Sequence, residues 1–258
     1  MKAHPTAVIH PEARLAASVT VGPFAVIGEG VELGEDCEVM THAVLQGATR
    51  MGHGNRIFPF AAIGFDPQDT KYHGEPTRLE AGDGNTFREY ITVHRGTSEG
   101  DGVTRIGSHN LLMAYVHIAH DCQLGSHIIM ANGASLAGHV VIGDHATVGP
   151  FCGIQQFTRI GAYSFLGSFT SVNRDILPYS KSTAPRPVDV LGANRLGLER
   201  RGLSKTDMDE LDQAFRLLCR SKLNTTQALE AIESRKFQSG HVKVLVEFVR
   251  TAERGLVK

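Results

Sequence analysis

The sequence of 258 residues contains no tryptophan and only four cysteines. These cysteines, Cys37, Cys122, Cys152 and Cys219, include no C-x-x-C pair. Scattered cysteines without paired spacing exclude a disulfide framework and favour free thiols in a reducing compartment. We therefore expect a cytoplasmic protein.

The chain also lacks an excess of either charge and any long apolar run. Its 26 basic and 27 acidic residues give a net charge of -1. The chain therefore has no overall positive charge that would attract nucleic acid. No stretch approaches the ~20 apolar residues of a membrane-spanning helix, and the N-terminus lacks the apolar core of a signal peptide. We expect no nucleic-acid partner and no membrane span, and local basic residues must bind any anionic ligand.

Glycine is abundant, with 28 residues, and aliphatic residues recur at every sixth position. The period covers ten consecutive positions from Ile9 to Ile63, three from Ala81 to Val93, and twelve from Ile106 to Val172. Such hexads are typical of a parallel β-helix, in which each repeat supplies one strand and one corner. Three strands close a coil of about 18 residues, and stacked coils bury an aliphatic column. The sequence therefore predicts an all-β solenoid.

Two segments, 64–80 and 94–105, interrupt the hexads. A β-helix is a rigid scaffold, and loops that leave such a scaffold often carry function. We expect both loops to contribute to a site.

The hexads stop after Val172, and a proline-containing crossing over 177–190 follows. Beyond it, apolar residues spaced by three and four predict helices. One helix is capped by Ser204, a second begins near Thr225, and a third ends at Gly255. We expect a β-helix domain over 1–190 and a helical domain over 191–258.

Histidines gather on the outside of the predicted coil. His117 and His120 lie on one segment, and a shift of 18 residues places Gly138 over His120 with His139 beside it. None of these residues occupies an inward aliphatic position, so the cluster indicates a functional site. Asp121 follows His120 directly. Neighbours on a strand point to opposite faces, so Asp121 reaches His120 only if a corner intervenes.

Several segments resemble the UDP-N-acetylglucosamine acyltransferase family. They are HRGT (94–97), NLLMAYVHIAHDC (110–122), LAGHV (136–140), QDTKYHGEPT (68–77) and RRG (200–202). The resemblance covers nearly the whole chain, including both loops. It implies a left-handed parallel β-helix of hexapeptide repeats with C-terminal helices, a homotrimer with active sites between adjacent subunits, and no cofactor. It also implies transfer of a (R)-3-hydroxyacyl chain from acyl carrier protein to the sugar 3-hydroxyl of UDP-N-acetylglucosamine, the first step of lipid A synthesis.

The resemblance also implies roles for individual residues. His120 would be the general base, Asp121 its orienting partner, and the Gly138 N–H the oxyanion donor. These roles suit the chemistry, because a sugar hydroxyl must lose its proton as it attacks a thioester and the developing oxyanion needs a fixed donor. The residues expected to bind substrate are Gln68, Asp69, Lys71, His94, His117, His139, Gln155, Gln156, Asn194, Arg200 and Arg201. Among them Lys71, Arg200 and Arg201 would hold the diphosphate, and Ser168 falls where the family sets acyl length.

Three departures from the family pattern leave the acceptor open. Gln155 stands where many relatives have histidine, Leu196 where they often have glutamate, and Thr70 where they often have leucine. All three fall near the expected nucleotide-sugar site. The acceptor could therefore carry a 3-amino group in place of the 3-hydroxyl.

Other functions are compatible with a hexapeptide β-helix. A related acyltransferase would use acyl-coenzyme A as its donor. A γ-class carbonic anhydrase would bind zinc through three histidines, for which His117, His120 and His139 are the candidates. The γ-class carbonic anhydrase reaction would not use Arg200, Arg201 or the loop at 68–72, so we predict no metal. A purely structural solenoid would leave the clustered histidines and the long loops unexplained.

Overall fold

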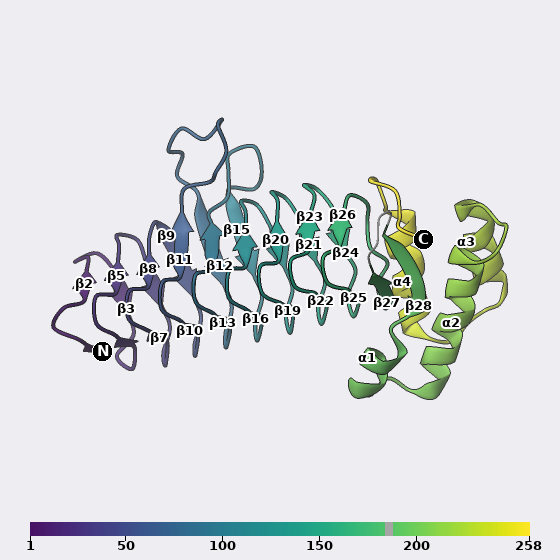
Figure 1. The fold of residues 1–258 in the computed structure, drawn as a ribbon, viewed down its shortest axis with the longest axis horizontal. Helices are drawn as coiled ribbons and strands as arrows, with labels where there is room; N and C mark the ends of the chain where they lie inside the picture. The colour runs from purple at the N-terminus through teal and green to yellow at the C-terminus, as the bar shows by residue number, and fades with distance from the viewer. Residues whose placement is uncertain (184–187) are drawn as a thin grey trace.

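Short parallel strands stack into a long solenoid that is capped at one end by helices (Figure 1). The computed structural model describes residues 1–183 and 188–258, so Pro185 and Pro187 of the predicted crossing lie outside the described residues. Most strands are two residues long, and strands three apart in chain order pair in parallel register through most of the solenoid, as Leu111 does with Ile129. The chain therefore visits three sheets in turn, which is the coil that the hexads predict.

The three sheets of the described chain have eleven, nine and eight strands. The eleven-stranded sheet contains β1 (Lys2–Ala3), β4 (Thr20–Val21), β7 (Glu38–Val39), β10 (Arg56–Ile57), β13 (Thr86–Phe87), β16 (Leu111–Leu112), β19 (Ile129–Met130), β22 (Thr147–Val148), β25 (Phe165–Leu166), β27 (Ser180–Thr183) and β28 (Asp189–Ala193), the last antiparallel. The nine-stranded sheet contains β2 (Val8–Ile9), β5 (Val26–Ile27), β8 (Val44–Leu45), β11 (Ala62–Phe65), β14 (Thr92–His94), β17 (His117–Ile118), β20 (Ser135–Leu136), β23 (Gly153–Ile154) and β26 (Ser171–Val172). The eight-stranded sheet contains β3 (Arg14–Leu15), β6 (Glu32–Leu33), β9 (Ala48–Met51), β12 (Arg78–Ala81), β15 (Val103–Ile106), β18 (Gln123–Leu124), β21 (Val141–Ile142) and β24 (Arg159–Ile160).

The sixth-position residues form the core, as predicted. Ile118 and Leu136 pair in adjacent coils and are fully buried, as are Leu112 and Met130 on the next sheet. Burial of each such side chain contributes about 1.5–3 kcal/mol, and the stacked coils repeat that contribution along the solenoid.

Most coils turn their corners at residues with positive φ. In one coil these residues are Tyr115 (φ 62°), Asp121 (φ 60°) and His127 (φ 58°), six positions apart. A positive φ is uncommon for residues other than glycine, and aspartate and histidine adopt it more readily than most. The corners of successive coils stack into three rows along the solenoid. We name each row after one of these residues: the Tyr115 corner, the Asp121 corner and the His127 corner.

The described residues after the solenoid form four helices: α1 (Arg195–Arg200), α2 (Lys205–Cys219), α3 (Thr225–Ser234) and α4 (Gly240–Arg250). The predicted starts are confirmed, because the Ser204 side chain accepts a hydrogen bond from the Asp207 N–H and Asn224 caps the helix that begins at Thr225. None of the helices in the described chain is both long and apolar enough to cross a membrane.

The predicted end of the last helix at Gly255 is wrong. The helix α4 ends at Arg250, and Gly255 (φ 73°) lies in the tail that follows. The tail leaves the helical path because it pairs with the last coil, where the Asp175 N–H donates to the Gly255 carbonyl and the Val257 N–H to the Asp175 carbonyl. The helix α1 lies outside the predicted helices, and it places Arg200 and Arg201 at its C-terminal end, where cations are favourable.

Candidate active site

The two loops that interrupt the hexads project from the same side of the solenoid (Figure 1). One joins β11 to β12 and the other joins β14 to β15, so both replace turns of the Asp121 corner. The Lys71 ammonium bonds the Glu99 carboxylate at 2.8 Å and links the two loops. The loops therefore stand beside the corner that carries His120.

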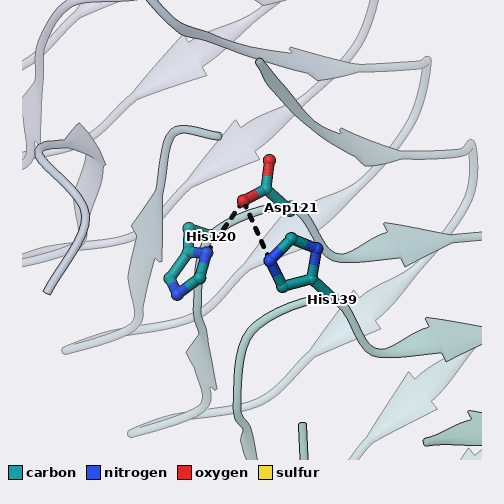
Figure 2. A group of neighbouring side chains, drawn as sticks. All are labelled: His120, Asp121 and His139. Carbon is teal, nitrogen blue, oxygen red and sulfur yellow. Dashed lines mark hydrogen bonds and ion pairs between the residues drawn. The ribbon is translucent and has the colours of Figure 1, made fainter. Parts of the chain in front are cut away.

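His120 and Asp121 form a hydrogen-bonded pair at this corner (Figure 2). The His120 Nδ1 lies 2.8 Å from the Asp121 Oδ2. The positive φ of Asp121 turns the chain between the two residues, so the corner that the pairing requires is present. Both side chains are nearly buried, with exposed fractions of 10% and 3%.

Thr97, from the second loop, holds the Asp121 carboxylate from the other side. Its backbone N–H donates to Oδ1 at 2.9 Å and its hydroxyl to Oδ2 at 2.6 Å. Burial alone would raise the pKa of Asp121, but the hydrogen bonds from His120 and Thr97 outweigh it and hold this pKa below its ordinary value. An ionised carboxylate only accepts hydrogen bonds, so the neutral His120 carries its proton on Nδ1 and presents the Nε2 lone pair.

Gly138 lies directly against the His120 ring. A Cβ at Gly138 would stand 2.5 Å from the His120 Cε1 and 2.6 Å from Nε2, so the ring occupies the space of a side chain. The N–H groups on either side, of Ala137 and His139, donate to the carbonyls of Ile154 and His120. In the described part of the chain, the Gly138 N–H has no such acceptor, and it remains available to a ligand.

The remaining histidines surround this pair. His139 places Nε2 3.5 Å from the Asp121 Oδ2 (Figure 2). The His139 ring also stacks on the Phe157 ring. The His117 Nδ1 bonds the Thr92 hydroxyl at 2.8 Å, and His94 meets the His117 ring edge-on. Burial lowers the pKa of His117 and His139, and lowers that of His94 to about 4. These three rings are therefore neutral at pH 7 and suit the binding of hydroxyl groups.

Asp69 brings the first loop to the base. Its Oδ2 lies 3.9 Å from the His120 Nε2, the nitrogen that faces Gly138. Gln68 and Lys71 flank it with exposed side chains. Gln155 and Gln156 are exposed at the Asp121 corner, two coils beyond His120. The structure thus brings most of the predicted site residues together.

Four predicted residues lie at other corners of the same chain. The Asn194 N–H donates to the Tyr179 carbonyl at 2.7 Å, on the His127 corner, and Arg200 and Arg201 follow at the end of α1. Ser168 is exposed and precedes Phe169 on the Tyr115 corner. One protomer does not bring these residues to His120.

His120, Asp121 and His139 could hold a metal ion, since their ligand atoms lie within 4.8 Å of one another. This set differs from the three histidines of the zinc hypothesis. His117 is outside it and bonds Thr92 instead.

The sequence did not predict the residues that position Asp121 by hydrogen bonds. Thr97 lies in the HRGT segment, but the sequence indicates no contact between it and Asp121. The sequence likewise indicates no role for Thr104, whose hydroxyl accepts a hydrogen bond from the Asp121 N–H at 2.8 Å. A short polar residue in the loop opposite a predicted aspartate was the available signal. That pattern predicts a contact only when the loop is known to fold back on the Asp121 corner.

Two family models match the chain. The model described as UDP-N-acetylglucosamine O-acyltransferase, domain 2, matches residues 175–257, and the bacterial transferase hexapeptide model matches residues 139–174. Curated proteins named acyl-(acyl-carrier-protein)–UDP-N-acetylglucosamine O-acyltransferase are similar over full length. The protein from Saccharophagus degradans is 49% identical and that from Thermodesulfovibrio yellowstonii 43%, each match covering 99% of this chain and 98% of the relative.

The chain belongs to the UDP-N-acetylglucosamine O-acyltransferase family.

Solved structures of this family superpose closely. The acyltransferase LpxA from Acinetobacter baumannii has a TM-score of 0.96 at 41% identity and covers 99% of both chains. The UDP-N-acetylglucosamine acyltransferase from Arabidopsis has a TM-score of 0.86 at 30% identity, over 98% of this chain and 99% of its own. The predicted fold, a left-handed parallel β-helix with C-terminal helices, is confirmed, and the protein is an acyltransferase. The division of the chain at residues 190 and 191 stays a prediction.

Proposed function

We propose that this protein transfers a (R)-3-hydroxyacyl chain from acyl carrier protein to the 3-position of UDP-N-acetylglucosamine, the first step of lipid A synthesis. The observation that carries the proposal is the arrangement of His120 between Asp121 and Gly138. The Asp121 carboxylate fixes the proton on the His120 Nδ1, and the Nε2 lone pair faces a glycine whose N–H is free. Acyl transfer to a hydroxyl needs these two groups side by side.

The reaction follows from these positions. His120 Nε2 takes the proton of the sugar 3-hydroxyl as its oxygen attacks the thioester carbonyl carbon. The negative charge that develops on the carbonyl oxygen accepts a hydrogen bond from the Gly138 N–H. When the carbon–sulfur bond breaks, the imidazolium gives the proton to the departing thiolate, and the donor leaves as a thiol. Asp121 stabilises the transient positive charge of His120.

The loop and the neutral histidines supply a place for the sugar. Asp69 lies beside the base, and His117 and His139 offer uncharged ring nitrogens to hydroxyl groups. We assign His94, Gln68, Gln155, Gln156 and Asn194 to substrate binding at the same site, and Lys71, Arg200 and Arg201 to the diphosphate, as the family resemblance implies. The cytoplasmic location stays a prediction.

The acceptor and donor are tested by comparing initial rates with two sugars and two donors. UDP-N-acetylglucosamine is compared with its 3-amino analogue, and hydroxyacyl carrier protein with hydroxyacyl-coenzyme A. We expect the highest kcat/KM with UDP-N-acetylglucosamine and the carrier protein. A preference for the amino sugar would assign Thr70, Gln155 and Leu196 to a changed acceptor, and a preference for coenzyme A would refute the proposed donor.

A homotrimer would complete the site. Arg200, Arg201 and Asn194 lie on the His127 corner of one protomer, whereas His120 lies on the Asp121 corner. A neighbouring copy that packs against the Asp121 corner would supply the arginines in trans. We predict a sedimentation mass of three chains for the active enzyme. A fully active monomer would contradict a site between subunits.

Acyl length is tested at Ser168, an exposed residue on the Tyr115 corner. Its hydroxymethyl group would fill part of an acyl groove that glycine leaves open, so the preferred chain should be shorter than in relatives with glycine. Ser168→Gly should shift the preference toward longer donors, measured as relative kcat/KM across a series of chain lengths. An unchanged profile would show that another residue sets the length.

A further inference from the structure

One arginine closes the base of the loop that reaches the active site. The Arg95 guanidinium donates to the Gly64 carbonyl at 2.7 Å and pairs with Asp66, where the loop leaves β11. It also donates to the hydroxyl of Tyr72, midway along the loop between β11 and β12, at 2.9 Å. We refer to these contacts of Arg95 with Gly64, Asp66 and Tyr72 as the Arg95 clamp.

The clamp is held in place from below. The Arg95 side chain is only 13% exposed. A Cβ at Gly47 would stand 2.1 Å from the Arg95 Nη1, so the guanidinium fills the space above that glycine. The Arg95 N–H donates to the Phe65 carbonyl at 3.1 Å, which fixes the backbone of β14 to the start of the loop. A planar group with several donors suits such a junction, and a lysine ammonium does not reproduce its geometry.

Short contacts lead from the clamp to the base. The Tyr72 N–H donates to the Asp69 carbonyl at 3.1 Å, and the Lys71 N–H donates to the Asp69 Oδ1 at 3.0 Å. The other oxygen of Asp69 lies 3.9 Å from the His120 Nε2. Arg95 itself makes no contact with His120 among the described interactions, so its effect on the site passes through the loop.

We infer that Arg95 is a positioning residue that preorganises the loop of Gln68, Asp69 and Lys71 for the nucleotide sugar. The inference rests on the proposed function, because it takes that loop to bind UDP-N-acetylglucosamine. Without the clamp, the loop must be ordered when the sugar binds, and the lost conformational entropy weakens binding. The acyl-transfer step uses His120 and Gly138, which the clamp does not touch.

The test is a kinetic comparison of Arg95→Ala, Arg95→Lys and wild type. We expect Arg95→Ala to raise the KM for UDP-N-acetylglucosamine by about 10-fold to 100-fold, with kcat changed less than about threefold and the KM for the acyl donor unchanged. Arg95→Lys should recover only part of the loss. Arg14→Ala is the control, because Arg14 is an exposed arginine whose ion pair with Glu32 lies in the first coils.

Hydrogen exchange gives a readout that does not depend on activity. In Arg95→Ala the amides of residues 66–73 should exchange faster than in wild type, while those of the coil around Ile118 keep their protection. If Arg95→Ala does not fold, Tyr72→Phe removes one contact of the clamp and should raise the same KM by about threefold to tenfold.

The two proposals fail in different ways. If wild type transfers no acyl chain to UDP-N-acetylglucosamine, the proposed function is refuted, and hydrogen exchange still measures the clamp. If wild type is active but the KM and the exchange of residues 66–73 stay within twofold of wild type in Arg95→Ala, the inference about Arg95 is overturned.

Discussion

Replacing His120 by alanine is expected to lower turnover by about 10²–10⁴, the usual contribution of a positioned general base, or roughly 3–5 kcal/mol of barrier. The physical reason is the pairing with Asp121, which leaves the His120 Nε2 as the basic atom beside Gly138. The trimer and substrate binding should remain largely intact, because the imidazole lies outside the aliphatic column and its loss opens no core cavity. Turnover is measured in a single-turnover experiment, so that chemistry limits the rate.

Two further variants separate the roles of the histidines. His117→Ala should weaken mainly sugar binding, with a smaller effect on turnover, because His117 bonds Thr92 rather than the carboxylate. His10→Ala, in the first coils and far along the chain from the corner, should behave as wild type. If His120→Ala keeps more than about a tenth of wild-type turnover with chemistry rate-limiting, the base assignment is wrong.

Gly138→Ala is expected to lower kcat by about 10²–10³, because the new methyl group displaces the general base while the backbone N–H is retained. The added Cβ would stand 2.5 Å from the His120 Cε1, so the ring must move from its place between Asp121 and Gly138. The methyl group also stands close to the N–H that is free for the oxyanion. The backbone itself accepts alanine, because Gly138 does not have positive φ.

The control for this variant is Gly153→Ala. Gly153 lies on β23 of the same solenoid, and a Cβ there would meet nothing within 4 Å. Both proteins should keep the thermal stability of wild type, and only Gly138→Ala should lose activity. Equal kcat values for the two variants would show that catalysis does not depend on the close approach of the His120 ring to Gly138.

The solenoid could be predicted from the sequence because its information is local and repeated. Each hexad contains one aliphatic residue that points inward, such as Ile118 or Leu136. A shift of 18 residues then places one coil on the next. The same shift correctly placed Gly138 over His120. Periodicity also marked 64–80 and 94–105 as loops, since the count fails there.

The contacts made by the loops could not be predicted in this way. Thr97 reaches Asp121 and Arg95 reaches Tyr72 only because the two loops fold against one corner, and no period in the sequence encodes that approach. The end of α4 was missed for a similar reason. Its apolar spacing continues, but the pairing of the tail with Asp175 stops the helix at Arg250.

The pairing of His120 with Asp121 could be predicted only in part. The sequence placed them side by side, and strand alternation alone would have turned them apart. The positive φ at Asp121 reverses that expectation. The hexad count does locate a corner near residue 121, since the inward residues on either side are Ile118 and Leu124.

The most direct test of metal-independent acyl transfer by His120 is product formation by wild type in the presence of a metal chelator. Purified protein is mixed with UDP-N-acetylglucosamine and (R)-3-hydroxyacyl carrier protein, and the nucleotide sugar is weighed by mass spectrometry. We expect a UDP-sugar that is heavier by one hydroxyacyl group, formed at the same rate with and without chelator, and formed far more slowly by His120→Ala. A rate that the chelator abolishes, or no acylated sugar from a folded protein and an intact donor, would contradict it.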